Sequence, residues 1–179
     1  MALQKKKYTK TILSEQSHRI LERLEQTDLF RSASRIALYH ALPGEVQTAG
    51  FIEKWHTEKT LYLPAVEGDD LRLLPYRGSE HLKTGSFGIF EPTEAETSPA
   101  TAIAYPALDL IIVPGIAFDR HNNRLGRGKG YYDRLLAELH IPKIGICFDF
   151  QLFDAIPTEP FDKKMNLIIS EKETTAWTD

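Results

Sequence analysis

The hydrophobic and polar positions of the chain follow two periods, one helical and one extended. Residues 9–26 gather their apolar side chains near one face of a polar segment, a spacing that predicts a surface helix. The apolar segment RIALYHAL (35–42) predicts a buried strand, and residues 46–59 predict a second helix. TLYLPAV (60–66) predicts another strand, which Pro64 is expected to end. Strand, helix and strand in this order predict a βαβ unit.

The middle of the chain combines an irregular stretch with the most strand-like segment of the sequence. A short strand is predicted over 71–76, and an irregular loop rich in Gly, Pro and Thr is predicted over 82–99. Loops of this length are uncommon in compact domains, so we expect this one to cover a functional site. LDLIIVPGIAF (108–118) has the continuous Leu, Ile and Val content of a strand covered on both faces, which Pro114 is expected to end.

The last third of the chain repeats the alternation of helix and strand. It predicts a loop over 118–130, a helix over 131–140, a strand over 143–148, a short helix over 151–156 and a strand over 165–170. Alternating elements predict an α/β protein with helices on both faces of a sheet. In such sheets ligands bind beyond the carboxyl ends of the strands.

The bulk composition narrows the class of protein. With 179 residues, of which 42% are hydrophobic and 26% charged, the chain is expected to form a single domain over residues 1–179. The net charge of −3 provides no global field for nucleic acid or acidic membrane, so neither is an expected partner. No apolar run approaches the roughly 20 residues that cross a bilayer, and no secretory signal is recognised. Cys147 is the single cysteine, which excludes an internal disulfide, so a cytoplasmic protein is expected.

The segment RLGRGKGYYD (124–133) carries the strongest functional signal. Its three glycines alternate with two cations, so its backbone is free to adopt positive φ values and to approach a ligand without Cβ atoms between them. Because the segment runs into a predicted helix, its N–H groups and the helix N-terminus would form one anion site. It is not a Walker A loop, because Gly130 follows Lys129. We predict a phosphate site here, with a flexible basic turn as the alternative.

Three residues in or beside this segment have two interpretations each. Asp133 either stabilises the dipole of the predicted helix or holds Mg²⁺ beside a phosphate. Tyr131 and Tyr132 are either core rings or a wall for a flat heterocycle. Farther along, Cys147 is interpreted as a buried strand thiol rather than a nucleophile.

The segment VPGIAFDRHNNRLGRGKGYYDRLL (113–136) closely resembles the signature of the 5-formyltetrahydrofolate cyclo-ligase family. Looser similarity extends in the same order through LPGEVQT (42–48), LYLPAV (61–66), GSFGIFEP (85–92) and EPFDKKMN (159–166). The resemblance implies a three-layer αβα sandwich with a mostly parallel central sheet, Rossmann-like, and a monomer. It also implies conversion of 5-formyltetrahydrofolate to 5,10-methenyltetrahydrofolate, with Mg²⁺ and ATP required and ADP and phosphate released.

The chemistry of this reaction agrees with a phosphate-binding loop. A formamide carbon is a poor electrophile, so the formyl oxygen must be activated before N10 of the folate displaces it. Transfer of the γ-phosphoryl group of ATP to that oxygen provides the activation, after which N10 attacks and phosphate leaves. Such a transfer requires mainly positioning and charge neutralisation from the protein.

The resemblance assigns the nucleotide to the glycine-rich segment. Carried over position by position, its ATP-binding residues are Arg124, Leu125, Gly126, Arg127, Gly128, Lys129, Gly130, Tyr131 and Tyr132. Arg127 and Lys129 are the implied catalytic residues, since they would neutralise the transferring group.

The resemblance also implies a folate site. Its residues are His40, Glu45, Phe87, Arg127 and Tyr131. Glu45 aligns with a glutamate that hydrogen-bonds the pterin, whose amino group and ring N–H present adjacent donors. Without the resemblance, Glu45 would be interpreted as a carboxylate at a helix N-terminus.

The magnesium ligands implied by the family fall on Asp133 and Asn166. Asn166 stands where the family commonly has an aspartate, so either Asp162 assists or the metal site is weaker. The family also places a Lys and an Arg on its first helix against the ATP phosphates. Here the run KKK (5–7) either replaces them or forms a solvated surface.

Two other functions were weighed against the cyclo-ligase. A phosphosugar-binding isomerase-like α/β enzyme would use a glycine-rich anion site with a general base and without ATP. A nucleic-acid-binding protein would use the basic, aromatic segment as a contact loop, but the net charge of −3 disfavours it.

Overall fold

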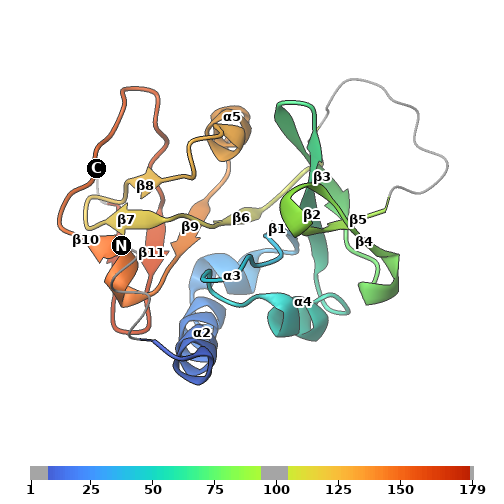
Figure 1. Cartoon of the computed structure of the whole chain (residues 1–179), viewed down its shortest axis with the longest axis horizontal. Helices are drawn as coiled ribbons and strands as arrows, with labels where there is room; N and C mark the ends of the chain where they lie inside the picture. Colours follow the sequence, from blue (N-terminus) through green and yellow to red (C-terminus); the bar gives the residue numbers. More distant parts are fainter. Residues whose placement is uncertain (1–7, 94–104, 178–179) are drawn as a thin grey trace.

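A seven-stranded sheet forms the middle layer of the molecule (Figure 1). The computed structural model describes residues 8–93 and 105–177, apart from the side chain of Phe87. In spatial order the strands are β12 (Thr174–Ala176), β11 (Leu167–Ile169), β9 (Lys143–Ile146), β6 (Leu110–Val113), β1 (Arg35–Ala37), β2 (Thr60–Glu67) and β3 (Asp70–Pro75). The inner strands from β11 to β2 are parallel, and β12 and β3 add to the two edges antiparallel. The mostly parallel sheet is therefore confirmed.

Outer layers cover both faces of this sheet. One holds α2 (Lys10–Glu25), α3 (Asp28–Ser32) and α4 (Ala49–Trp55) (Figure 1). The other holds α5 (Tyr131–Glu138) and a small sheet of β10 (Leu152–Phe153), β7 (Ala117–Asp119) and β8 (Arg124–Leu125).

The side chains of β6 alternate between the two layers, which explains why this strand is apolar throughout. Leu110 and Ile112 pack with the core on the α2 side, whereas Ile111 and Val113 pack with the core on the α5 side. All four are essentially inaccessible to solvent, as expected for a central parallel strand. The three-layer αβα prediction is thereby confirmed.

Some boundaries differ from the prediction because tertiary contacts decide them. The first strand ends at Ala37 rather than residue 42, because the chain turns beyond it and the Thr48 hydroxyl donates to the carbonyl of Tyr39 at 2.6 Å. Pro64 does not end β2. The backbone groups of successive residues in β2 point to opposite sides. The Tyr62 carbonyl accepts from the Leu38 N–H and the Val66 N–H donates to Glu91, so these residues direct their backbone groups away from β3. Pro64 lies between them on the same side, so the N–H that it lacks is not one that β3 uses.

Two segments predicted as loop or helix contain extended structure. The loop predicted over 82–99 includes a hairpin of β4 (Leu82–Thr84) and β5 (Phe90–Pro92), with the 3₁₀ turn η2 (Ser86–Gly88) between them. The helix predicted over 151–156 is wrong: a 3₁₀ turn, η3 (Asp149–Gln151), leads into β10, which pairs with β7. A further 3₁₀ turn, η1 (Ser79–His81), precedes β4. Within the described ranges, no helix has both the length and the apolar content to cross a bilayer.

Replacing Gly145 by alanine is expected to destabilise the fold by about 2 kcal/mol, the usual cost of overpacking a core. Gly145 lies in the centre of β9, and a Cβ atom there would stand 2.5 Å from Cε1 of the fully buried Phe118. The matched control is Gly50→Ala in α4, where a Cβ would meet nothing within 4 Å and helix propensity predicts a gain of about 0.5–1 kcal/mol. Urea unfolding measures both changes, and equal stability of the two variants would contradict this packing argument.

Candidate active site

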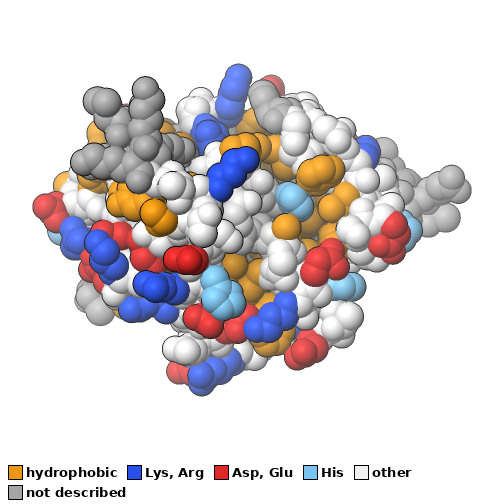
Figure 2. Space-filling view, turned by 60° about the horizontal axis from the view of Figure 1, so that its bottom comes forward, with side chains coloured by type: hydrophobic (Ala, Val, Ile, Leu, Met, Phe, Trp, Pro, Cys, Tyr) orange, Lys and Arg blue, Asp and Glu red, His pale blue; other side chains and the backbone are white. Residues whose placement is uncertain are grey.

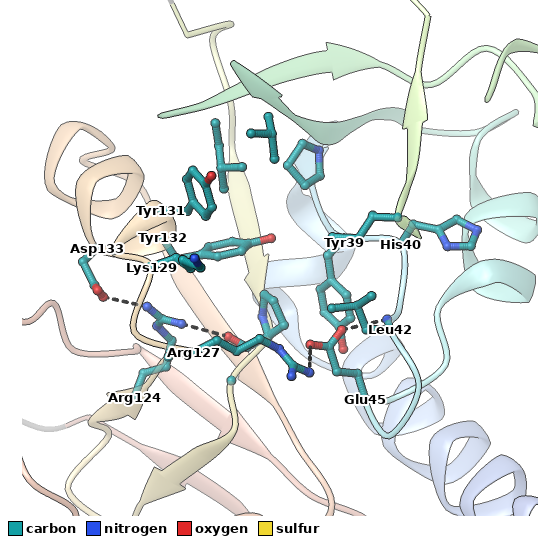
Figure 3. A pocket seen from close by; sticks show the side chains of 18 of the residues that line it. Tyr39, His40, Leu42, Glu45, Arg124, Arg127, Lys129, Tyr131, Tyr132 and Asp133 are labelled. Atoms are coloured by element: carbon teal, nitrogen blue, oxygen red, sulfur yellow. Dashed lines mark hydrogen bonds and ion pairs between the residues drawn. The ribbon is translucent and has the colours of Figure 1, made fainter. Parts of the chain in front are cut away.

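A cavity of about 330 Å³ opens at the carboxyl ends of β1 and β6 (Figure 3). From β1 the chain proceeds to β2 on one side, while β6 lies on the other, so the strand order reverses between β1 and β6. Ligands of open α/β sheets bind at such a reversal. Tyr39 and His40 follow β1, Pro114 and Gly115 follow β6, and all four line the cavity.

The glycine-rich loop connects β8 to α5 and forms one wall of this cavity. Gly128 and Gly130 have φ values of +82° and +72°, a backbone region that favours glycine. Gly130 also occupies the position directly before α5, so the loop ends on the N-terminus of an eight-residue helix. Lys129 lines the cavity between these two glycines. The predicted loop geometry is therefore present, and the helix follows it as expected.

Gly126 has a different reason to be glycine. It does not have a positive φ, but a Cβ atom there would stand 3.1 Å from the Arg124 guanidinium nitrogens. Arg124 is almost fully buried, with 5% of its side chain exposed. A side chain at position 126 would therefore require this buried cation to shift by a few tenths of an ångström, whereas the backbone conformation itself sets no such limit.

Arg127 and Glu45 face one another across the cavity (Figure 3). The Arg127 Nη2 atom donates to Glu45 Oε1 at 3.0 Å, and the backbone N–H of Leu42 donates to Glu45 Oε2 at 2.9 Å. The side chain of Glu45 is 8% exposed and that of Arg127 is 48% exposed. Glu45 precedes α4 by four residues, so the interpretation as a helix N-terminal carboxylate is wrong. Two residues far apart in the sequence thus share one charge pair at the site.

Arg124 and Asp133 form a second charge pair at the base of the loop. Arg124 Nη2 donates to Asp133 Oδ1 at 2.6 Å, while Arg124 Nη1 donates to the carbonyl of Pro114 at 3.2 Å. Asp133 lies in the first turn of α5, as predicted, and its side chain is 41% exposed. Its carboxylate therefore has contact with both the cavity and the protein interior.

Aromatic rings form much of the remaining wall. Tyr131 and Tyr132 line the cavity and also pack on the core beneath α5, so the structure shows them as core rings, while their role as a wall for a heterocycle remains a prediction. Burial raises the pKa of Tyr132 well above its usual value, and the nearby charge of Glu45 raises it further. Burial lowers the pKa of His40, whose ring meets that of Phe90 edge-on with centroids 5.1 Å apart. Both shifts favour the neutral forms, the phenol of Tyr132 and the uncharged imidazole of His40, at pH 7.

Other predicted residues lie outside this cavity. Asn166 precedes β11 at the amino edge of the sheet, and its Oδ1 accepts from the N–H of Lys143 at 2.8 Å. The structure therefore does not bring Asn166 to Asp133. Leu125 pairs with Ala117 between β8 and β7. Cys147 is fully buried after β9, and burial raises the pKa of its thiol, as the interpretation as an inert thiol requires.

Two groups of predicted residues cannot be placed in the same way. The basic run at residues 5–7 lies outside the described residues, as does the side chain of Phe87. The backbone of Phe87 belongs to η2, on the hairpin whose residues Ile89 and Glu91 line the cavity.

Glu91 is a cavity residue that the sequence reasoning missed. It lies on β5 with 5% exposure, and its Oε1 accepts from the N–H of Val66 on β2 at 3.2 Å. Gly85 packs so closely on this carboxylate that a Cβ atom would overlap it. The available signal was a lone acid in the apolar segment GIFEP (88–92), which lies within the predicted covering loop. Glu91 ties that hairpin to the main sheet.

Comparisons with known proteins find one family whose members are similar to this chain over most of its length. A model of the 5-formyltetrahydrofolate cyclo-ligase family matches residues 1–171. The 5-formyltetrahydrofolate cyclo-ligase of Haemophilus influenzae is 34% identical over 140 residues, which are 74% of this chain and 73% of that protein. The NMR structure of Aquifex aeolicus 5,10-methenyltetrahydrofolate synthetase has a TM-score of 0.84 at 33% identity, covering 97% of this chain and 87% of that one. The corresponding synthetase from Mycoplasma pneumoniae has a TM-score of 0.67 at 26% identity, with 92% and 90% covered.

Proposed function

The chain belongs to the 5-formyltetrahydrofolate cyclo-ligase family, and from this premise we propose how its cavity performs the reaction. The protein is an enzyme that cyclises 5-formyltetrahydrofolate to 5,10-methenyltetrahydrofolate. We propose that ATP drives the cyclisation by phosphorylating the formyl oxygen. The observation that carries this proposal is the meeting of the glycine-loop cations and Glu45 around one largely apolar cavity.

The glycine-rich loop is the proposed site of the ATP phosphates. Positive φ values at Gly128 and Gly130 bring bare backbone to the cavity, and the N-terminus of α5 adds its unpaired N–H groups. Arg127 and Lys129 supply charge where the γ-phosphoryl group is transferred. About half of the Arg127 side chain is already exposed, so its guanidinium can contact a phosphate without first having to be uncovered.

The apolar part of the cavity is the proposed site of the folate. Glu45 is held by the N–H of Leu42 with its second oxygen toward Arg127, so its carboxylate is fixed in the cavity wall. A fixed carboxylate matches the paired amino and ring N–H donors of a pterin. His40 and Tyr131 border the same space, and the hairpin that bears Phe87 forms the cover. N10 then attacks the activated carbon, and phosphate carries away the formyl oxygen.

Asp133 fits the role of a magnesium ligand, whereas Asn166 does not. Magnesium beside nucleotides is usually held by one or two carboxylates together with phosphate oxygens and water. The half-exposed carboxylate of Asp133 stands beside the proposed phosphate loop, but Asn166 lies at the opposite edge of the sheet. Among the described residues no cluster of three or more His, Cys, Asp or Glu side chains is suited to a metal. Bound Mg²⁺ would add positive charge at the transferring phosphoryl oxygens.

Membership in the family argues against the two alternative functions, the phosphosugar isomerase and the nucleic-acid-binding protein. An isomerase acting on phosphosugars would leave the carboxylate of Glu45 and the large apolar cavity without a purpose. On the face shown in Figure 2, positive and negative side chains are interspersed, which gives a nucleic acid no continuous basic track.

The test is absorbance at the methenyl-folate band after the protein is mixed with 5-formyltetrahydrofolate, Mg²⁺ and ATP. A rise that requires ATP, with one ADP formed for each ring closed, is the expected result. A rise of equal rate without ATP would overturn the proposed activation. No rise at all, together with nucleotide-free turnover of phosphosugars, would favour the isomerase instead.

A further inference from the structure

The buried cation Arg124 joins two parts of the candidate active site, the end of β6 and the first turn of α5. Its guanidinium donates to the Pro114 carbonyl after β6 at 3.2 Å and to Asp133 on α5 at 2.6 Å (Figure 3). The guanidinium also lies over the ring of Tyr132, 5.4 Å from its centroid. Only 5% of its side chain is exposed, against 48% for Arg127. Arg124 therefore lines the cavity as a nearly buried side chain whose guanidinium already donates to two protein acceptors.

Two glycines make room for this enclosed side chain. A Cβ atom on Gly126 would stand 3.1 Å from the guanidinium nitrogens of Arg124. A Cβ atom on Gly115 would stand 3.2 Å from Arg124 Cγ and 2.8 Å from the ring of Phe118. Backbone therefore packs against Arg124 from both the end of β6 and the start of the glycine loop. Turning the guanidinium toward a phosphate would break both of its hydrogen bonds within this packing.

We infer that Arg124 is a positioning residue for Asp133, not one of the phosphate-binding cations. The inference rests on the proposed function, since it assigns Asp133 to magnesium. Arg124 holds one carboxylate oxygen, Oδ1, and so would fix the rotamer in which the other oxygen is available to hold the ion. An Asp133 carboxylate without this partner would sample several rotamers and would hold the ion in fewer of them.

This role and a phosphate-binding role predict different results for nucleotide binding. A phosphate ligand contributes whether or not Mg²⁺ is present, because its partner is the nucleotide. A residue that acts through Asp133 would contribute only when Mg²⁺ is present, because Asp133 would act on the nucleotide through the ion. Residues that hydrogen-bond a metal ligand typically contribute about 10- to 100-fold to metal affinity, and Arg124 is expected at the low end because 41% of the Asp133 side chain is exposed.

The experiment is isothermal titration calorimetry of ADP, with and without Mg²⁺, on the full chain and its Arg124→Gln variant. Mg²⁺-dependent affinity is expected to fall about tenfold, whereas affinity for ADP in EDTA stays within twofold. Arg127→Gln is the matched comparison and is expected to lower affinity for ADP under both conditions. A tenfold loss for Arg124→Gln in EDTA would overturn the inference, because it would identify Arg124 as a phosphate ligand.

A double-mutant cycle with Asp133→Asn supplies the second test. If Arg124 acts through Asp133, adding Arg124→Gln to Asp133→Asn costs no further Mg²⁺-dependent affinity, and additive losses would contradict that. Arg124→Lys keeps the cation in case Arg124→Gln does not fold, and it should retain part of the Mg²⁺ dependence. A wild-type protein that binds no ADP under either condition would refute the proposed ATP site itself, which separates the two failures.

Discussion

Replacing Arg127 by alanine is expected to lower kcat for ring closure about 10³-fold, the scale on which cations that stabilise phosphoryl transfer act. Arg127 is the half-exposed guanidinium of the glycine loop and lines the same cavity as Lys129. Binding of the nucleotide by Arg127 should make KM for ATP rise several-fold, but the larger loss should appear in kcat, because charge develops on the transferred group only as the reaction proceeds. Steady-state rates from the methenyl-folate absorbance measure both constants.

The matched control for this variant is Arg120→Ala. Arg120 is 44% exposed and pairs with Asp154 and Glu173 at the tip of the β7–β8 hairpin, outside the cavity. Its kcat should remain within twofold of wild type. Arg127→Lys should recover part of the lost rate, because it keeps the charge without the planar donors. A loss below tenfold in Arg127→Ala would show that the transferring group is neutralised elsewhere.

The sheet and the position of the site were predictable because local patterns determine them. A strand covered on both faces must be apolar at consecutive positions, and residues 110–113 are. The glycine-rich segment follows that strand, and the carboxyl edge of a parallel sheet is where such a segment can act. Residue type also permits the positive φ values at Gly128 and Gly130, although Gly126 in the same segment does not adopt one.

The direction of each charged side chain was not predictable, because distant residues decide it. Arg124 and Arg127 are three positions apart in one segment, yet one is buried on Asp133 and the other reaches Glu45, 82 residues away in the sequence. The family resemblance assigned Asn166 to magnesium, but the hydrogen bond from Lys143 holds it at the amino edge of the sheet. Residue type limits what a side chain can bind, whereas tertiary packing decides where it points.

Replacing Glu45 by glutamine is expected to have opposite effects on the two substrates. Turnover of 5-formyltetrahydrofolate should fall about 100-fold, because a pterin that presents two donors would meet an amide with one acceptor and one donor. Affinity for ADP should instead rise about fivefold. In the free protein Glu45 and Arg127 neutralise one another at 3.0 Å, so a nucleotide must first displace Glu45 from the guanidinium.

The size of that rise follows from the exposure of the pair. Arg127 is 48% exposed, so solvent screening limits its pairing with Glu45 to about 1 kcal/mol, or roughly fivefold in affinity.

Because either substrate breaks the Glu45–Arg127 ion pair, binding of the first substrate removes that cost for the second. Linkage makes this effect the same in both directions. Calorimetry of ADP with and without 5-formyltetrahydrofolate measures the coupling in wild type and should find none in Glu45→Gln. Glu22→Gln, which alters an exposed carboxylate on α2, is the control and should match wild type. Unchanged ADP affinity in Glu45→Gln would mean that the ion pair does not oppose nucleotide binding and that Arg127 meets phosphate without releasing Glu45.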